Sequence, residues 1–119
     1  MSAENIIAVV ILCICMLPII VLGIFQTKSK EPVGFWSGVK PPTGDMVSDV
    51  AAYNKKHGIM WIIYGAGILP AFFLGMFFGE MVAVCALGVE IIGGLVAMVC
   101  YHNYLDKKYV NFSIDSHIV

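Results

Sequence analysis

The chain has 119 residues, of which 60% are hydrophobic and 13% are charged, and its formal net charge at pH 7 is −1. Soluble globular domains carry about 25% charged residues, so the composition excludes an ordinary soluble domain. The length fits one domain. The net charge itself says nothing about nucleic acid, and we expect no nucleic-acid partner.

Three apolar stretches decide the class of protein. Residues 6–25 and 59–78 contain no charged side chain, and residues 81–101 contain only Glu90. At 1.5 Å per residue, each stretch forms a helix of about 30 Å, which matches the hydrocarbon core of a bilayer. The first stretch lacks the basic segment and the cleavage site of a signal peptide, so we expect it to be retained. We predict an all-α membrane protein, one membrane domain over residues 1–119, with spans at about 6–26, 59–78 and 81–101.

The basic residues predict an orientation. All seven are lysines, and they lie in the first connector or beyond the third span: Lys28, Lys30, Lys40, Lys55, Lys56, Lys107 and Lys108. By the positive-inside rule, the connector 27–58 and the tail 102–119 face the cytoplasm, and the N-terminus and the turn at residues 79–80 face outward. We expect a multi-pass protein of the cell membrane, surrounded by the lipid bilayer.

The connector predicts a further helix. The Pro41-Pro42 pair prevents helix just before it, and Thr43 is a candidate N-cap. Apolar or aromatic side chains then recur at helical spacing, at Met46, Val50, Tyr53 and His57. We predict an amphipathic helix over about residues 44–57, on the cytoplasmic side between the first and second spans, with a bend at Gly58.

Small residues recur every third or fourth position in the last two spans. The second span carries Gly67, Ala71, Gly75 and Gly79, and the third carries Ala86, Glu90, Gly93 and Ala97. Small residues let helix backbones approach closely in lipid, where the hydrophobic effect does not drive association. We predict that these stripes pack against each other or against a second subunit, in a homo-oligomer or a larger membrane complex.

Glu90 is the main candidate for chemistry within the membrane. A charged side chain at mid-bilayer costs about 3 kcal/mol on insertion scales, and no span contains a Lys or Arg to pair with it. Two readings stay open: a protonatable or cation-binding site, and a protonated carboxyl that donates a structural hydrogen bond to a neighbouring helix.

The connector supplies candidates for binding a partner. They are the polar and aromatic side chains of Trp36, Ser37, Tyr53, Asn54 and His57. For Trp36 the alternative is an anchor at the membrane interface, and for His57 it is a solvent-facing side chain. A site shared by His57 and His102 is conceivable, although the sequence alone does not bring them together.

The sequence contains no pattern of an active site. It has no nucleophile–base pair, no phosphate-binding loop and no H-E-x-x-H motif. The four cysteines lie within the spans without the paired spacing of metal ligands. We therefore expect that the protein is not an enzyme and that it has no catalytic residues, no cofactor and no metal site.

Two segments resemble a known family. Residues 34–37 (Gly-Phe-Trp-Ser) and 52–58 (Ala-Tyr-Asn-Lys-Lys-His-Gly) are similar to motifs of the bacterial sporulation-delaying-protein immunity family and related small Firmicute membrane proteins. In that family, a Gly-x-Arg-Thr-like turn follows one span and an aromatic-x-x-Asn-like segment precedes the next. Gly34, Ser37, Tyr53 and Asn54 match approximately, whereas Trp36 replaces the arginine, so a role for that charge is not implied. The resemblance implies a membrane immunity or signal-receptor role, in which the protein binds a toxic peptide or holds a regulator.

Three hypotheses for function follow. The first is a non-enzymatic binding, immunity-type or signalling protein that recognises a peptide or partner protein. The second is a small oligomeric transporter or channel that uses Glu90 as its intramembrane protonatable group. The third is a structural subunit of a larger membrane complex.

Overall fold

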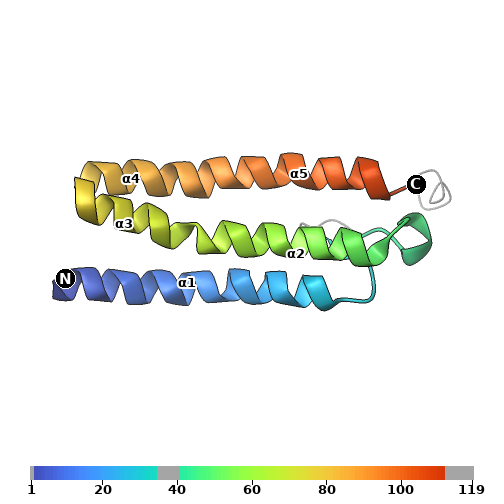
Figure 1. The fold of residues 1–119 in the computed structure, drawn as a ribbon, viewed down its shortest axis with the longest axis horizontal. Coiled ribbons are helices and arrows are strands. Elements are labelled where there is room, and N and C mark those ends of the chain that lie inside the picture. The colour runs from blue at the N-terminus through green and yellow to red at the C-terminus, as the bar shows by residue number, and fades with distance from the viewer. Residues whose placement is uncertain (1, 35–40, 112–119) are drawn as a thin grey trace.

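The fold consists of three helical rods lying side by side (Figure 1). The computed structural model describes residues 2–34 and 41–111, which extend over 58 × 23 × 22 Å. The first rod is α1 (Ala3–Lys28), and the second joins α2 (Val50–Ala66) to α3 (Ile68–Phe78). The third rod joins α4 (Glu80–Gly88), the π-helical turn η2 (Val89–Gly93) and α5 (Gly94–Tyr109). The described residues form no β-strand, and the predicted all-α class is confirmed.

Each rod is long and apolar enough to cross a membrane: Ala3–Lys28, Val50–Phe78 and Glu80–Tyr109. Little of this apolar surface is covered by the chain itself. In the most apolar 18-residue segment of the third rod, only 6% is buried within the protein. Phe77 and Met81 are 82% and 76% exposed. Monomeric soluble proteins rarely expose contiguous apolar surface of this kind.

The two ends of the bundle differ in charge. The N-terminus and the turn between α3 and α4 lie at one end, and the connector and the end of α5 lie at the other (Figure 1). Gly79 makes the turn with a φ of 108°, a conformation that glycine adopts without a steric penalty. Lys28 closes α1, and Lys107 and Lys108 lie in the last turn of α5, so lysines mark the connector end. Lys40 lies outside the described residues.

The first two rods touch through glycine backbones. A β-carbon built on Gly23 would lie 2.5 Å from the carbonyl oxygen of Gly58, and one on Gly58 would overlap Gly23 and Thr27. The predicted bend at Gly58 is therefore wrong, because α2 continues through this residue. The interruption falls at Gly67 instead, where Pro70 has no N–H to donate to the carbonyl of Ala66.

The predicted amphipathic helix over residues 44–57 does not form as a separate element. Gly44–Met46 is a single 3₁₀ turn, and the later residues begin the second rod at Val50. Asp49, not Thr43, caps α2, by accepting a 3.0 Å hydrogen bond from the backbone N–H of Ala52. The helical spacing of Val50, Tyr53 and His57 belongs to α2, whereas Met46 lies in the 3₁₀ turn.

The connector is fastened to the end of α5. Val47 forms an isolated antiparallel bridge with Val110. The N–H of Ser48 donates to the carbonyl of Tyr109 at 2.8 Å, and that of Asn111 to the carbonyl of Met46 at 2.7 Å. Because α5 runs to Tyr109, residues 102–109 are helical rather than part of a tail. These bonds set the register between the polar ends of α2 and α5.

Candidate functional site

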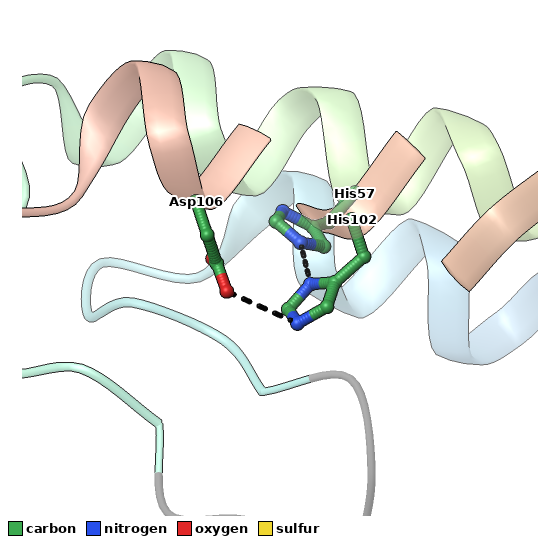
Figure 2. Close-up of side chains that lie close together, drawn as sticks. All are labelled: His57, His102 and Asp106. Atoms are coloured by element: carbon green, nitrogen blue, oxygen red, sulfur yellow. Dashed lines mark hydrogen bonds and ion pairs between the residues drawn. The ribbon is translucent and has the colours of Figure 1, made fainter. Parts of the chain in front are cut away.

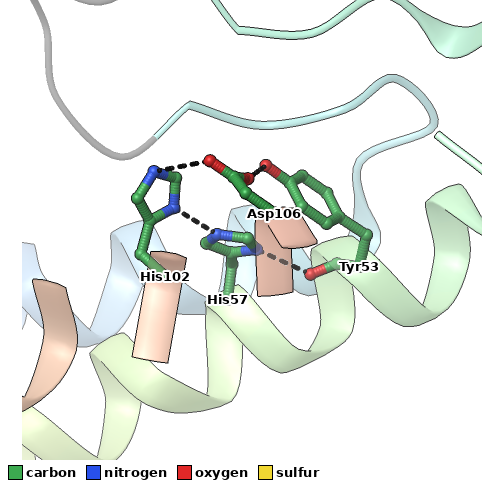
Figure 3. A network of polar contacts seen from close by, with 4 residues as sticks. All are labelled: Tyr53, His57, His102 and Asp106. Carbon is green, nitrogen blue, oxygen red and sulfur yellow. Dashed lines mark hydrogen bonds and ion pairs between the residues drawn. The ribbon is translucent and has the colours of Figure 1, made fainter. Parts of the chain in front are cut away.

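Four polar side chains meet between α2 and α5 near the connector end. Tyr53 and His57 lie one turn apart on α2, and His102 and Asp106 lie one turn apart on α5 (Figure 3). This spacing places each pair on one face of its helix. Leu105, which is fully buried beside Tyr53, holds the two helices together at this level.

The four side chains form one continuous network. Nε2 of His57 lies 2.9 Å from Nδ1 of His102, and Nε2 of His102 lies 3.2 Å from Oδ2 of Asp106 (Figure 2). The hydroxyl of Tyr53 donates to Oδ1 of Asp106 at 2.6 Å. His57 and Tyr53 are 0% exposed, whereas the side chains of His102 and Asp106 are 13% and 21% exposed. The network therefore has a buried side and an accessible side.

The backbone fixes the tautomer of His57. Its Nδ1 lies 2.8 Å from the carbonyl oxygen of Tyr53, which can only accept a hydrogen bond. Nδ1 therefore carries the proton and donates a hydrogen bond to this carbonyl, and Nε2 of the neutral ring directs a lone pair toward His102. Nε2 of His57 can thus accept a hydrogen bond or bind a metal ion.

Asn54 has a structural task. Its side-chain amide donates to the carbonyls of Ser29 and Glu31, at 3.1 and 2.8 Å, and its oxygen accepts from the N–H of Val33 at 3.0 Å. The side chain is fully buried. Asn54 therefore fixes the chain that leaves α1 against α2.

A second feature is a groove along the hairpin of the second and third rods. On the connector side, a hollow of about 460 Å³ is lined by Lys56, Ile63 and Gly67 of the second rod and by Glu90, Gly94 and Tyr101 of the third. Toward the α3–α4 turn, a second hollow of about 920 Å³ is lined by residues that include Leu74, Met81 and Cys85. Both hollows share Gly67, Glu90, Gly94 and Ala97.

Glu90 lies at the junction of the two hollows, where both helices are irregular. It belongs to the π-helical turn η2 and faces Gly67, at which α2 gives way to α3. A β-carbon on Gly67 would lie 2.6 Å from Oε1 of Glu90, so the glycine makes room for the carboxyl. Nearby, the hydroxyl of Tyr64 donates to the carbonyl of Ile91 at 2.9 Å. Within the described chain, the carboxyl of Glu90 makes no hydrogen bond and no ion pair.

The predicted stripes lie mostly within the hairpin. Gly67 faces Glu90, and Gly75 packs so closely on Ala83 that a β-carbon would overlap it. The other members of the two stripes are Ala71, which is buried, Gly79, which is exposed in the turn, Ala86, which is partly buried, and Gly93 and Ala97, which are exposed beside the groove.

The described candidates for partner binding are buried and do not form an exposed patch. Tyr53, Asn54 and His57 are each 0% exposed and bonded within the protein. The alternative that His57 faces solvent is therefore wrong, because α5 covers the ring. Trp36 and Ser37 lie outside the described residues.

One member of the polar network, Asp106, is not predicted from the sequence, because it lies in the segment 102–119, which the end of the third apolar stretch marks as a tail. The four-residue spacing between His102 and Asp106 was the available signal, since it repeats the spacing between Tyr53 and His57. The pairing of the two helices could not be read from spacing alone.

Comparison with known proteins found no matching family model, no matching curated protein and no matching solved structure.

Proposed function

We propose that this chain is a membrane-embedded, non-enzymatic binding protein whose groove receives an apolar peptide helix carrying one basic side chain. The observation that carries the proposal is the position of Glu90. Its carboxyl is at the junction of two apolar hollows and has no hydrogen-bond or ion-pair partner in the described chain. A carboxylate in such surroundings gains most from a cation that enters the groove.

Insertion in the membrane is part of this proposal. It is supported by three long apolar helices with largely uncovered surfaces and by the described lysines, which lie toward the connector end. The N-terminus and the α3–α4 turn are placed outside the cell, and the connector and the C-terminal end are placed in the cytoplasm. The apolar surface that remains uncovered by a peptide is available to lipid or to further subunits, in a homo-oligomer or a larger membrane complex.

The occupant is another polypeptide rather than a second copy of this chain. Residues 6–25 and 59–101 contain no Lys, Arg or His, so a span from a second copy brings no basic group to Glu90. The two hollows follow the hairpin from Lys56 to Met81, which suits an extended apolar helix. The sequence resemblance to the sporulation-delaying-protein immunity family implies the same class of ligand.

Synthetic helices test the proposal. The protein in lipid nanodiscs is titrated with a labelled Leu/Ala helix that carries a central lysine, and with the same helix carrying leucine there. A hydrogen bond to a charged group contributes about 1.5–3 kcal/mol, so we expect the lysine helix to bind about tenfold more tightly or better.

The matched variants are Glu90→Gln, which should abolish the preference for lysine, and Glu80→Gln in the exposed turn, which should retain it. Equal binding of the two helices to the wild-type protein would refute the proposed recognition. A lysine preference that persists in Glu90→Gln would refute the assigned role of Glu90.

Transport is a second candidate, supported by the extent of the hollows. One leads from Glu90 toward the connector end and the other toward the α3–α4 turn, so a protonatable group lies midway along a continuous groove. In proteoliposomes, this candidate predicts a proton flux that is lost in Glu90→Gln while assembly is retained. Absence of proton flux in the wild-type protein would rule out the transport function.

A further inference from the structure

We propose that His57, His102 and Asp106 form a binding site for a divalent transition-metal ion, with Zn²⁺ as the best-fitting metal. One ligand atom from each of the three residues can be chosen so that all three atoms lie within 4.8 Å of one another (Figure 2). The inference does not depend on the groove, and it departs from our expectation that the chain has no metal site.

The buried side of the site is already arranged for coordination. The carbonyl of Tyr53 accepts a hydrogen bond from Nδ1–H of His57. The Nε2 lone pair of His57 is therefore directed at His102 (Figure 3). Metal-binding histidines usually donate their other ring N–H to a backbone carbonyl or carboxylate in this manner. His57 is therefore held in the tautomer and the orientation that a metal requires.

The carboxylate is oriented in the same way. The hydroxyl of Tyr53 donates to Oδ1 of Asp106 at 2.6 Å, whereas Oδ2 faces His102 at 3.2 Å. One tyrosine thus supports two of the three ligands, by its backbone carbonyl and by its hydroxyl. Outer contacts of this kind typically change metal affinity by about 10–100-fold.

The charges of the site favour a cation. Because Nε2 of His57 is an acceptor, Nδ1–H of His102 donates the hydrogen bond between the two rings; in the neutral His102 ring the Nε2 lone pair then faces the carboxylate of Asp106, and the two repel. A cation among the three residues removes this repulsion. Within the described chain, the only ion pair of Asp106 is the one with His102, which exists only when that ring is protonated, so a metal ion and a proton compete for this position and no lysine neutralises the carboxylate.

Binding requires the ligands to move closer together. Zn–N bonds of about 2.0–2.1 Å in tetrahedral geometry separate two nitrogens by about 3.3 Å, whereas the three ligand atoms lie within 4.8 Å of one another, so the ring of His102 and the carboxylate of Asp106 must shift toward the ion. Two imidazoles and one carboxylate are a common ligand set for Zn²⁺, with a fourth position left for water. His102 and Asp106 are partly exposed, which gives the ion a route of entry.

The consequence for the fold is a link between α2 and α5 at the connector end. His57 belongs to one helix, and His102 and Asp106 belong to the other. Lys56 and Tyr101, which line the groove, are direct sequence neighbours of His57 and His102. A bound ion would therefore hold together the two walls of the groove at this end.

The test uses the full chain, purified in detergent with a histidine-free affinity tag and stripped of metal with a chelator. Zn²⁺ is titrated against a chromophoric competitor, and the bound metal is counted by mass spectrometry. Co²⁺ provides a spectroscopic check, because four-coordinate Co²⁺ absorbs much more strongly than six-coordinate Co²⁺. We expect one Zn²⁺ per chain and a four-coordinate cobalt spectrum.

The variants separate a metal site from a structural network. His102→Gln and Asp106→Asn, both at partly exposed positions, should lose the bound ion, and Asn103→Ala on the same helix should retain it. Tyr53→Phe should keep the stoichiometry and weaken the affinity about 10–100-fold. Failure of the wild-type chain to bind Zn²⁺ would overturn the proposal, as would unchanged stoichiometry in both His102→Gln and Asp106→Asn while helical content is retained.

Discussion

Gly67 and Glu90 face each other across the hairpin, and the carboxyl occupies the space that a side chain at residue 67 would fill. A β-carbon at residue 67 would lie 2.6 Å from Oε1 and 2.8 Å from Cδ of Glu90. The break between α2 and α3 and the π-helical turn η2 meet at this point. π-Helical turns inside α-helices occur frequently at functional sites.

Gly67→Ala should displace the carboxyl of Glu90 with little loss of stability, because the obstructed atoms are the far end of a flexible side chain. We expect the preference for the lysine helix to fall toward that of Glu90→Gln, with the thermal unfolding temperature nearly unchanged. Peptide titration in nanodiscs measures the effect. Gly88→Ala is the control, because a β-carbon there meets nothing within 4 Å; equal peptide binding by the two variants would contradict the assigned contact.

Gly58→Ala should destabilise the packing of α1 on α2. The new methyl group would overlap the backbone of Gly23 and Thr27, which has no flexible end to move aside. Overpacking of this kind costs about 1–3 kcal/mol, whereas Gly88→Ala should gain up to about 1 kcal/mol from helix propensity. Equilibrium unfolding in mixed micelles compares the two variants, and a Gly58→Ala protein as stable as Gly88→Ala would refute the close approach.

Asn54→Ala should release the segment that follows α1. The variant loses three hydrogen bonds to the backbone of residues 29–33, at a cost of about 2–4 kcal/mol. Hydrogen exchange at the amide of Val33 should accelerate strongly. The exposed Asn103→Ala serves as the control, and unaltered exchange at Val33 in Asn54→Ala would show that Asn54 does not hold this segment.

The orientation can be tested with single cysteines in a variant that lacks the four native ones. Glu80→Cys, in the α3–α4 turn, should react with a membrane-impermeant maleimide in intact cells. Lys30→Cys, in the connector, should react only after permeabilisation, because the proposed orientation places the lysine-bearing end in the cytoplasm. Labelling of Lys30→Cys from outside would reverse the proposed topology.

The sequence predicted the helical class because three charge-free or nearly charge-free stretches are each as long as a bilayer is thick. It did not predict where the helices end. Polar residues such as Tyr53 and Asp106 extend α2 and α5 beyond their apolar parts, since helix formation continues as long as no residue interrupts it. Spacing correctly identified Val50, Tyr53 and His57 as one helical face, but it could not show that α5, rather than lipid, covers that face.

The candidate site depends on pairings between helices, which one sequence does not contain. Glu90 was recognisable from its charge within an apolar span, whereas its position opposite Gly67 follows from the register of the hairpin. The approach of His57 to His102 similarly depends on the bonds that fasten Val47 and Ser48 to the end of α5. The Gly23–Gly58 contact is not predictable from the sequence, because Gly23 is the single glycine of α1 and so forms no small-residue stripe.

The most direct test of the central claim, that a peptide helix binds in the groove beside Glu90, is site-specific photocrosslinking in nanodiscs. A photoreactive amino acid is placed at Ala97, which lines both hollows, or at its neighbour Val96, which is 60% exposed and lines neither. The account predicts adducts with the lysine helix from residue 97 but not from residue 96, and their loss in Glu90→Gln. Equal crosslinking from both positions, or adducts unaffected by Glu90→Gln, would contradict it.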